Sequence, residues 1–302
     1  MEFGLSRYKR QQKLLIKLLR SLDSIFFKEY SRKHLKVQIL SKEGSIATVK
    51  ALDFIWKLDT TRYIDEYILK NGIFEPESTA LIQKLVEPSM IVLDVGANFG
   101  YYTLQFARLV GENGYVYAFE PVDRYRARLG EHLRLNNIRN VEVINKALSN
   151  KIATAKISVG ECSATFHWCS PGEAEEVQEV HLTTFDAFVE EHKIQKIDFL
   201  KVDLDGHELM FFEGAKNTLR KVKPIMLVEF CQEFLYASGT AAWDLADKLE
   251  NLGYVLISTK SRRAFQNRQE CFKEVANFSH SVNVLCIPSA SELLDVFKGG
   301  VL

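Results

Sequence analysis

The segment Asp-Val-Gly-Ala-Asn-Phe-Gly at residues 94–100 has the residue types of a ligand-binding turn. It follows an apolar run that is typical of a buried parallel strand, and a stretch with helical patterning comes after it. Gly96 and Gly100 would let a ligand approach the backbone closely, and a helix that begins there presents free N–H groups. Ligands of open α/β sheets bind beyond the carboxyl ends of the strands. We therefore predict a ligand site at this turn, with Asp94, Gly96, Asn98 and Gly100 among its residues.

The same turn argues against two common nucleotide sites. The dinucleotide fingerprint requires glycine where this chain has Asn98 and Tyr101, and no Gly-Lys-Ser/Thr follows that would indicate a P-loop. The acid at the end of the strand, Asp94, suits a ligand that carries an ammonium group and no pyrophosphate. S-adenosylmethionine has that character, so we predict it as the cofactor.

A second acid, Glu120, ends the next predicted strand, 26 residues after Asp94. A carboxylate in this place can accept hydrogen bonds from both hydroxyl groups of a ribose, whereas the alternative is an ordinary surface glutamate at a strand end. The turn at residues 145–148 follows the third predicted strand and would flank the adenine, mainly through backbone and small side chains. Together these features favour an adenosyl cofactor.

Four ionisable side chains follow the fourth predicted strand, namely Asp203, Asp205, His207 and Glu208. A buried structural strand would not end in such a cluster, which favours a functional role. The alternative is a helix N-terminus that Asp203 or Asp205 caps and whose dipole favours Glu208. With Glu229 at the end of the fifth strand, Asp203 and Asp205 could hold a divalent cation. No dedicated ligand spacing supports that alternative, and we predict no metal ion.

Alternating strands and helices must position these residues. Strands are predicted over residues 90–95, 115–120, 141–145, 198–203, 224–230, 254–258 and 282–287. Helices are predicted between them, over residues 101–110, 122–136, 207–220 and 241–252. This order predicts an α/β fold with a seven-stranded, mostly parallel sheet and helices on both faces.

Two segments depart from the alternation. Residues 1–75 are predicted as an N-terminal extension, with a basic amphipathic helix over 11–30 and a β-hairpin within 37–58 that turns at Glu43-Gly44. The catalytic domain is predicted over 76–302, beginning with a helix at 76–87. Within it, residues about 153–183 read as an insertion with short strands at 155–159 and 180–183.

Several blocks of the chain resemble FkbM-type methyltransferases over about residues 70–290. They are Gly-Ile-Phe-Glu at 72–75, Asp-Val-Gly-Ala-Asn-Phe-Gly-Tyr-Tyr-Thr at 94–103, Tyr-Ala-Phe-Glu-Pro at 117–121, Lys-Val-Asp-Leu-Asp-Gly-His-Glu at 201–208 and Gly-Ala at 214–215. The resemblance implies a class I Rossmann-like methyltransferase fold, S-adenosylmethionine as cofactor, and methyl transfer usually to a hydroxyl oxygen.

The resemblance also implies roles for individual residues. The cofactor-binding positions would be Asp94, Gly96, Asn98, Gly100, Tyr102, Thr103, Glu120, Ala147 and Asp203. Asp203 falls on the acidic position of the family's fourth strand. The chain departs from the family in having Asp205 before Gly206, where a glutamate is common, so the reach of that carboxylate is altered.

A hydroxyl is a poor nucleophile until its proton is removed, and a base with a pKa near neutral removes it best. We therefore predict His207 as the general base, held by Asp205 or Glu208. Asp203 is the alternative base, or it orients the methionine amine of the cofactor. The acceptor is predicted to be a small molecule or a glycan: a sugar, a glycolipid or a secondary metabolite. Aromatic residues such as Phe166 and Trp168 could stack on its ring or form ordinary core.

Composition restricts the remaining partners. The chain has 39 basic and 39 acidic residues, but residues 1–36 carry ten of the basic and three of the acidic ones. The rest is acidic on balance, which disfavours nucleic acid as a partner. The basic helix would pack on its own domain or in a homodimer, or contact a membrane surface. Methylation of RNA or protein, or cofactor binding without catalysis, remain as alternative functions.

Cysteine usage and hydropathy bear on the location of the chain. It has five cysteines, an odd number, without a Cys-x-x-Cys pair, so neither a disulfide framework nor a zinc site is predicted. No apolar run approaches the length that spans a bilayer, and no secretory signal is recognisable. We therefore predict a cytoplasmic protein.

Overall fold

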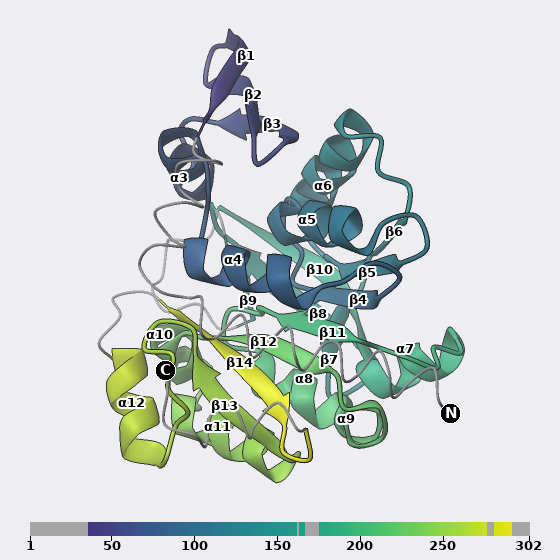
Figure 1. The fold of residues 1–302 in the computed structure, drawn as a ribbon, viewed down its shortest axis with the longest axis vertical. Helices are drawn as coiled ribbons and strands as arrows, with labels where there is room; N and C mark the ends of the chain where they lie inside the picture. Colours follow the sequence, from purple (N-terminus) through teal and green to yellow (C-terminus); the bar gives the residue numbers. More distant parts are fainter. Residues whose placement is uncertain (1–35, 162, 167–174, 277–280, 292–302) are drawn as a thin grey trace. The chain divides into compact units, whose positions relative to one another are not determined.

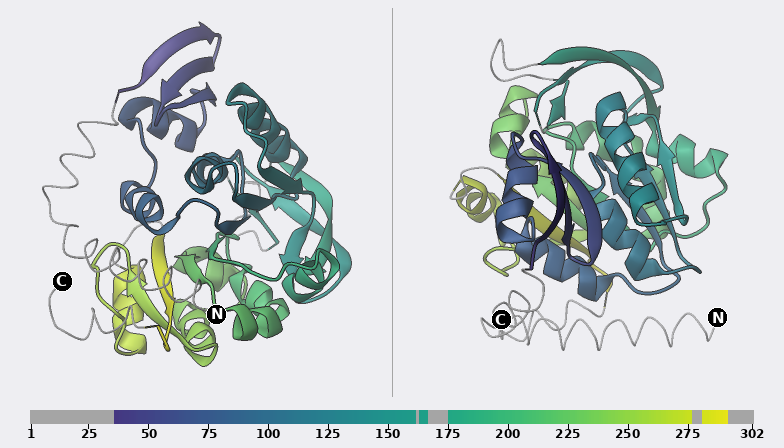
Figure 2. Two further views of the ribbon diagram at one scale, coloured as in Figure 1. Left: turned by 45° about the vertical axis from the view of Figure 1, so that its right-hand side comes forward. Right: turned by 90° about the horizontal axis from the view of Figure 1, so that it is seen from above.

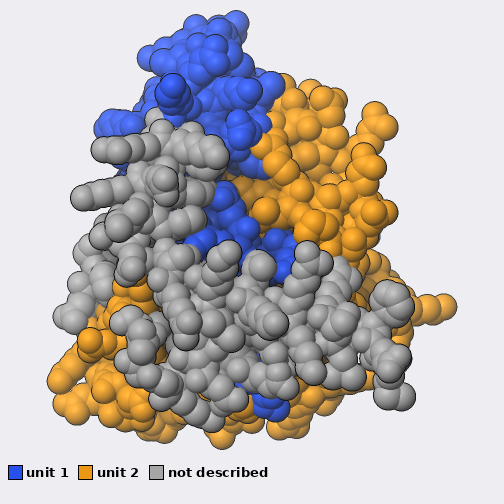
Figure 3. Space-filling view, in the orientation of Figure 1, with its two compact units in different colours: residues 1–87, 290–302 blue, residues 88–289 orange. Residues whose placement is uncertain are grey.

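The computed structural model describes residues 36–161, 163–166, 175–276 and 281–291 (Figure 1). The chain divides into two compact units, residues 1–87 with 290–302 and residues 88–289 (Figure 3). The sequence suggested a boundary near residue 75, whereas helix α4 (Pro76–Leu85) groups with the first unit. The predicted basic helix at 11–30 lies outside the described residues.

The first unit contains a three-stranded antiparallel sheet of β1 (Gln38–Glu43), β2 (Ile46–Ala51) and β3 (Phe54–Asp59). Helices α3 (Tyr63–Asn71) and α4 follow it. The prediction of a simple hairpin was therefore incomplete. The second turn is made by Leu52 and Asp53, which both have positive φ angles of 51° and 61°. Such angles at both central residues are typical of a type I′ hairpin turn, which glycine or asparagine usually marks in a sequence.

The second unit contains the predicted seven-stranded sheet. Its strands are β4 (Ile91–Val95), β5 (Tyr115–Phe119), β6 (Val141–Ile144), β11 (Phe199–Val202), β12 (Ile225–Phe230), β13 (Tyr254–Ser258) and β14 (Val282–Pro288). Their order across the sheet is β13-β14-β12-β11-β4-β5-β6. All neighbours from β12 to β6 are parallel, and β14 runs antiparallel to both of its neighbours. The predicted fold class is confirmed. The carboxyl ends of β4, β5, β11 and β12 consequently meet at one edge of the sheet.

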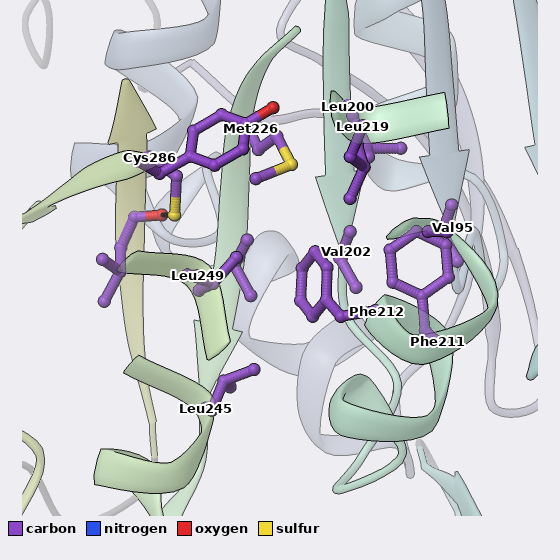
Figure 4. Packing of buried hydrophobic residues seen from close by; sticks show 14 of the residues in the cluster. Val95, Leu200, Val202, Phe211, Phe212, Leu219, Met226, Leu245, Leu249 and Cys286 are labelled. Atoms are coloured by element: carbon purple, nitrogen blue, oxygen red, sulfur yellow. Dashed lines mark hydrogen bonds between the residues drawn. The ribbon is translucent and has the colours of Figure 1, made fainter. Parts of the chain in front are cut away.

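Helices cover both faces of this sheet (Figures 1 and 2). One face carries α5 (Tyr101–Val110) and α6 (Asp123–Leu135), and the other carries α7 (Phe185–Glu191), α8 (Glu208–Gly214), α9 (Lys216–Val222) and α11 (Ala242–Asn251). Two further helices, α10 (Gln232–Ala237) and α12 (Arg268–Ala276), lie near the C-terminal strands. Figure 4 shows Phe211 and Phe212 of α8 packed with Val95 and Val202 in the core of the second face. The helix predicted over 207–220 is divided into α8 and α9.

The segment interpreted as an insertion belongs to a second sheet. Strands β7 (Ala147–Ser149), β8 (Ala153–Val159), β9 (Ala164–Thr165) and β10 (Glu176–Thr184) form it in the order β7-β10-β8-β9. β10 is antiparallel to β8 and parallel to β7. The predicted short strands lie within β8 and β10, which pair with each other, and the parallel pairing of β10 with β7 was not predicted.

The described part of the chain contains no helix that is both long and apolar enough to cross a bilayer. Its three described cysteines, Cys231, Cys271 and Cys286, are buried and form no disulfide.

Candidate active site

The turn between β4 and α5 lies against the end of β11. Gly96 has a φ of 85°, and a Cβ atom built on it would lie 1.8 Å from the carbonyl oxygen of Asp203. A Cβ on Gly100 would lie 2.4 Å from Leu129 Cδ1. The two glycines therefore make room for other parts of the protein itself. Gly96 lets the ends of two neighbouring strands approach each other, which brings Asp94 and Asp203 into one region.

Glu120 at the end of β5 holds the same turn through its side chain. Its Oε2 accepts a hydrogen bond from the backbone N–H of Asn98 at 2.7 Å, and its Oε1 accepts one from Val122 at 2.8 Å. Asn98 itself has a positive φ of 49°. Glu120 is only 4% exposed, and this burial raises its pKa to about 7. The carboxylate is thus fixed in orientation, and each oxygen retains a lone pair for a ligand hydroxyl.

Asp94 at the end of β4 is 1% exposed. Its Oδ2 accepts a hydrogen bond from the Thr103 hydroxyl at 2.6 Å, whereas its Oδ1 is buried with no hydrogen-bond partner. Burial raises the pKa of Asp94 to about 6, although the nearby Lys201 charge opposes that rise. Leaving a buried acceptor unsatisfied costs about 1–3 kcal/mol, so this oxygen is suited to accept a hydrogen bond from a ligand. Thr103, predicted to bind the cofactor, orients Asp94.

Two other predicted cofactor residues occupy different surroundings. Tyr102 of α5 is buried, and its ring lies 4.6 Å from Lys201 Nζ. Ala147 lies in β7 and pairs with Leu182 of β10, so it belongs to the second sheet. The turn before it is held by Arg126, whose Nη1 donates to Asn145 Oδ1 at 2.8 Å and to the Pro121 carbonyl at 3.1 Å. Arg126 therefore joins the ends of β5 and β6, a role that the sequence analysis did not identify.

The acidic cluster after β11 is largely buried and bonded to backbone. Asp205 has a positive φ of 48° and accepts a hydrogen bond from the backbone N–H of Ala164 at 3.0 Å. Glu208 accepts one from Leu204 N–H at 2.9 Å, while its Oε2 is buried with no partner. Burial raises the pKa of Glu208 to about 7, and burial followed by the charge of Asp203 raises the pKa of Asp205 well above its ordinary range.

His207 is buried, with its ring 4.5 Å from the ring of Phe166. Its Nε2 lies 2.9 Å from Ser149 Oγ of β7. This differs from the prediction that Asp205 or Glu208 would hold the ring, because the hydrogen bonds just described direct both carboxylates to backbone N–H groups. Phe166, expected to stack on a ligand or in the core, contacts the histidine, and Trp168 lies outside the described residues.

Glu229 at the end of β12 lies beside this cluster. One carboxylate oxygen from each of Asp203, Asp205 and Glu229 lies within 4.8 Å of the others, which is close enough to share a metal ion. The structure thus brings together the three residues of the alternative cation site. Lys201, which the sequence analysis did not identify as functional, places its Nζ 2.5 Å from Asp203 Oδ2 and so supplies positive charge to the same group. The sequence did offer a sign of its role, because Lys201 interrupts an apolar strand just before the acidic residues.

The edge of the sheet therefore presents carboxylates at the ends of four neighbouring strands, with buried acceptors that lack partners. Such an arrangement favours a cationic ligand that also offers hydroxyl groups. The glycine turn between Asp94 and Asn98 places both the first acid and the N-terminus of α5 at that edge.

Comparisons with known proteins agree with this chemistry. The family model of the FkbM methyltransferase domain matches residues 94–256, which is more than half of the chain. No curated protein matches the sequence.

Two solved structures illustrate the similarity. An FkbM methyltransferase from Methylobacillus flagellatus KT shares 14% identity at a TM-score of 0.42, and the match covers 75% of this chain and 56% of that protein. This chain therefore spans little more than half the length of that relative. A SAM-dependent methyltransferase from Aquifex aeolicus shares 19% identity at a TM-score of 0.40, over 70% of this chain and 89% of that one.

Proposed function

The chain belongs to the FkbM methyltransferase family, and we propose that it is a SAM-dependent methyltransferase that methylates a hydroxyl oxygen of a sugar, a glycolipid or a secondary metabolite. The observation that supports the site most directly is the pair of buried acids at adjacent strand ends, Asp94 and Glu120. One has a buried oxygen with no partner, and the other is held rigidly by two backbone N–H groups.

These residues fit S-adenosylmethionine. Glu120 would accept hydrogen bonds from the two ribose hydroxyls, because its oxygens are already oriented by Asn98 and Val122. Asp94 and Asp203 would attract the α-ammonium group of the methionine portion. When bound, the cofactor supplies an activated methyl group on a sulfonium. The alignment of the acceptor with that methyl group would provide most of the acceleration, since the leaving group is good.

The acceptor hydroxyl needs a base, and we assign that role to His207. An imidazole titrates near neutral pH, which makes it suited to proton removal. The Ser149 hydroxyl, 2.9 Å from Nε2, would fix the ring and its tautomer. Asp203 is the alternative base, because it is the more accessible acid at the same strand end, with a side chain that is 28% exposed.

Turnover of His207→Ala and His207→Gln tests the base. We expect both variants to lose at least about 100-fold in kcat, the typical contribution of a general base, while binding S-adenosylhomocysteine as the wild type does. His181→Ala, an exposed histidine of β10, is the matched control and should retain full activity. Rates near wild type in both His207 variants would remove His207 from catalysis and direct attention to Asp203→Asn.

The acceptor class requires a separate experiment. Purified protein is incubated with cofactor carrying a labelled methyl group and with fractionated native metabolites, glycans, RNA and protein. Label in an ether-linked methyl group of a small molecule or glycan would support the proposal. Label in RNA or protein, or cofactor binding without any product, would contradict it.

A further inference from the structure

Lys201 is a charged residue in the interior of the seven-stranded sheet. It belongs to β11, whose four residues are all buried, and it is only 1% exposed itself. An ammonium group removed from water is strongly unfavourable unless charged and polar partners surround it. An apolar residue would serve an ordinary central strand better, so the partners of Lys201 indicate what the charge is for.

Those partners are residues of the candidate cofactor site. Lys201 Nζ lies 2.5 Å from Asp203 Oδ2 and 4.6 Å from the centre of the Tyr102 ring. In the parallel pairing of β11 with β4, Lys201 is the register partner of Asp94. Paired residues of neighbouring strands point to the same face of a sheet, so the ammonium and the Asp94 carboxylate share the face that α5 covers.

The charge of Lys201 acts on both acids. Burial raises the pKa of Asp94, the Lys201 ammonium opposes that rise, and the neighbouring charge of Asp203 adds to it. Without the ammonium, two close carboxylates would face each other with no cation between them. The pKa of Asp94 would then rise further, and a protonated Asp94 would attract a cationic ligand more weakly.

We propose that Lys201 is a positioning residue, which holds the Asp203 carboxylate in place and keeps Asp94 and Asp203 ready to receive the α-ammonium group of S-adenosylmethionine. The geometry leaves one oxygen of each acid for that group: Lys201 takes Oδ2 of Asp203, and Thr103 takes Oδ2 of Asp94. The inference rests on the cofactor placement of the proposed function, and it is independent of the acceptor.

A pair of ligands separates this role from a purely structural ion pair. S-adenosylhomocysteine carries the α-amino acid portion, whereas 5′-methylthioadenosine has the same adenosyl thioether without it. A residue that only stabilises the fold affects both ligands alike. A residue that prepares the ammonium site affects the first ligand alone.

Dissociation constants for both ligands are measured by isothermal titration calorimetry at pH 7.5 with the full chain. We expect Lys201→Met to weaken binding of S-adenosylhomocysteine at least about 10-fold and that of 5′-methylthioadenosine less than about 3-fold. Lys201→Arg, which retains the positive charge, should recover part of the loss. The control is Lys196→Met: Lys196 is an exposed lysine that also pairs, at 2.6 Å, with an aspartate two residues later, and its loss should change neither constant.

Equal weakening of the two ligands by Lys201→Met, or no weakening, would overturn the inference. Thermal unfolding establishes whether this variant folds. Should it fail to fold, Lys201→Gln carries the same test, because it removes the positive charge and leaves Asp203 in place. A selective loss of S-adenosylhomocysteine in that variant supports the inference, and an unchanged ratio of the two constants overturns it. A selective loss in a protein that methylates no hydroxyl would leave the inference standing and refute the proposed function.

Discussion

Replacement of Glu120 by glutamine tests the ribose assignment with a change of only one atom. The two carboxylate oxygens of Glu120 accept hydrogen bonds from Asn98 N–H and Val122 N–H. A glutamine amide has one oxygen and one NH2 group, so one of these two backbone donors would face another donor. The substitution also removes the negative charge toward which the ribose hydroxyls would donate.

The magnitude follows from these contacts. A hydrogen bond to a charged group contributes about 1.5–3 kcal/mol, so the loss of one such bond to the ribose weakens binding roughly 10- to 150-fold. A buried backbone donor left without an acceptor costs about 1–3 kcal/mol more, which should appear as a lower Tm of the unliganded variant. Because burial raises the pKa of Glu120 to about 7, wild-type affinity should also fall below neutral pH, and Glu120→Gln should lose that part of the pH dependence.

The assay is calorimetric titration with S-adenosylhomocysteine between about pH 6 and pH 8, accompanied by thermal unfolding. Glu112→Gln is the matched control, because Glu112 is an exposed glutamate just before the same strand β5. A loss of affinity smaller than about 3-fold in Glu120→Gln, with an unchanged pH profile, would refute the assignment of Glu120 to the ribose.

Three further predictions concern packing, titration and metal. Gly96→Ala should lower the free energy of unfolding by at least about 2 kcal/mol, because the added Cβ would overlap the Asp203 carbonyl and because Gly96 has a φ of 85°. The control is Gly130→Ala, at an open position of α6, which should be neutral or stabilising. Equal effects of the two substitutions in denaturant titrations would contradict this prediction. The unliganded protein should lose stability as the pH rises from about 5 to about 8. Burial raises the pKa of Asp94 to about 6 and the pKa values of Glu120 and Glu208 to about 7. In this pH range the folded state therefore holds protons that the unfolded chain has already released. A Tm that increases over this range would argue against it. Methyl transfer should survive EDTA, since Lys201 already supplies positive charge to Asp203; a loss that Mg²⁺ restores would instead assign a cation to Asp203, Asp205 and Glu229.

The main sheet and the first part of the site were predictable because their signals are local. Each strand of the seven-stranded sheet is predominantly apolar, and α5 begins directly after Gly100 as predicted. Parallel strands end at one edge, so acids that close successive strands, such as Asp94 and Glu120, must lie near each other. The family resemblance rests on the same local blocks.

Contacts between distant segments were not predictable in this way. The second sheet depends on the pairing of β10 with both β7 and β8, and no periodicity encodes which strands pair. His207 proved to lie within hydrogen-bond distance of Ser149, which is 58 residues away in sequence. A turn built from Leu52 and Asp53 contains neither glycine nor asparagine, so the third strand of the first unit was missed.

The sequence by itself determined the order of strands and helices, the glycine turn and the acids at strand ends, because hydrophobic periodicity and backbone freedom are properties of short segments. Only the tertiary structure decided what each of those acids contacts. It placed the Lys201 ammonium between Asp203 and the Tyr102 ring, left Asp94 Oδ1 buried without a partner, and directed Glu208 to backbone N–H groups. The physical reason is that burial and charge pairing depend on neighbours that the fold brings together from separate strands.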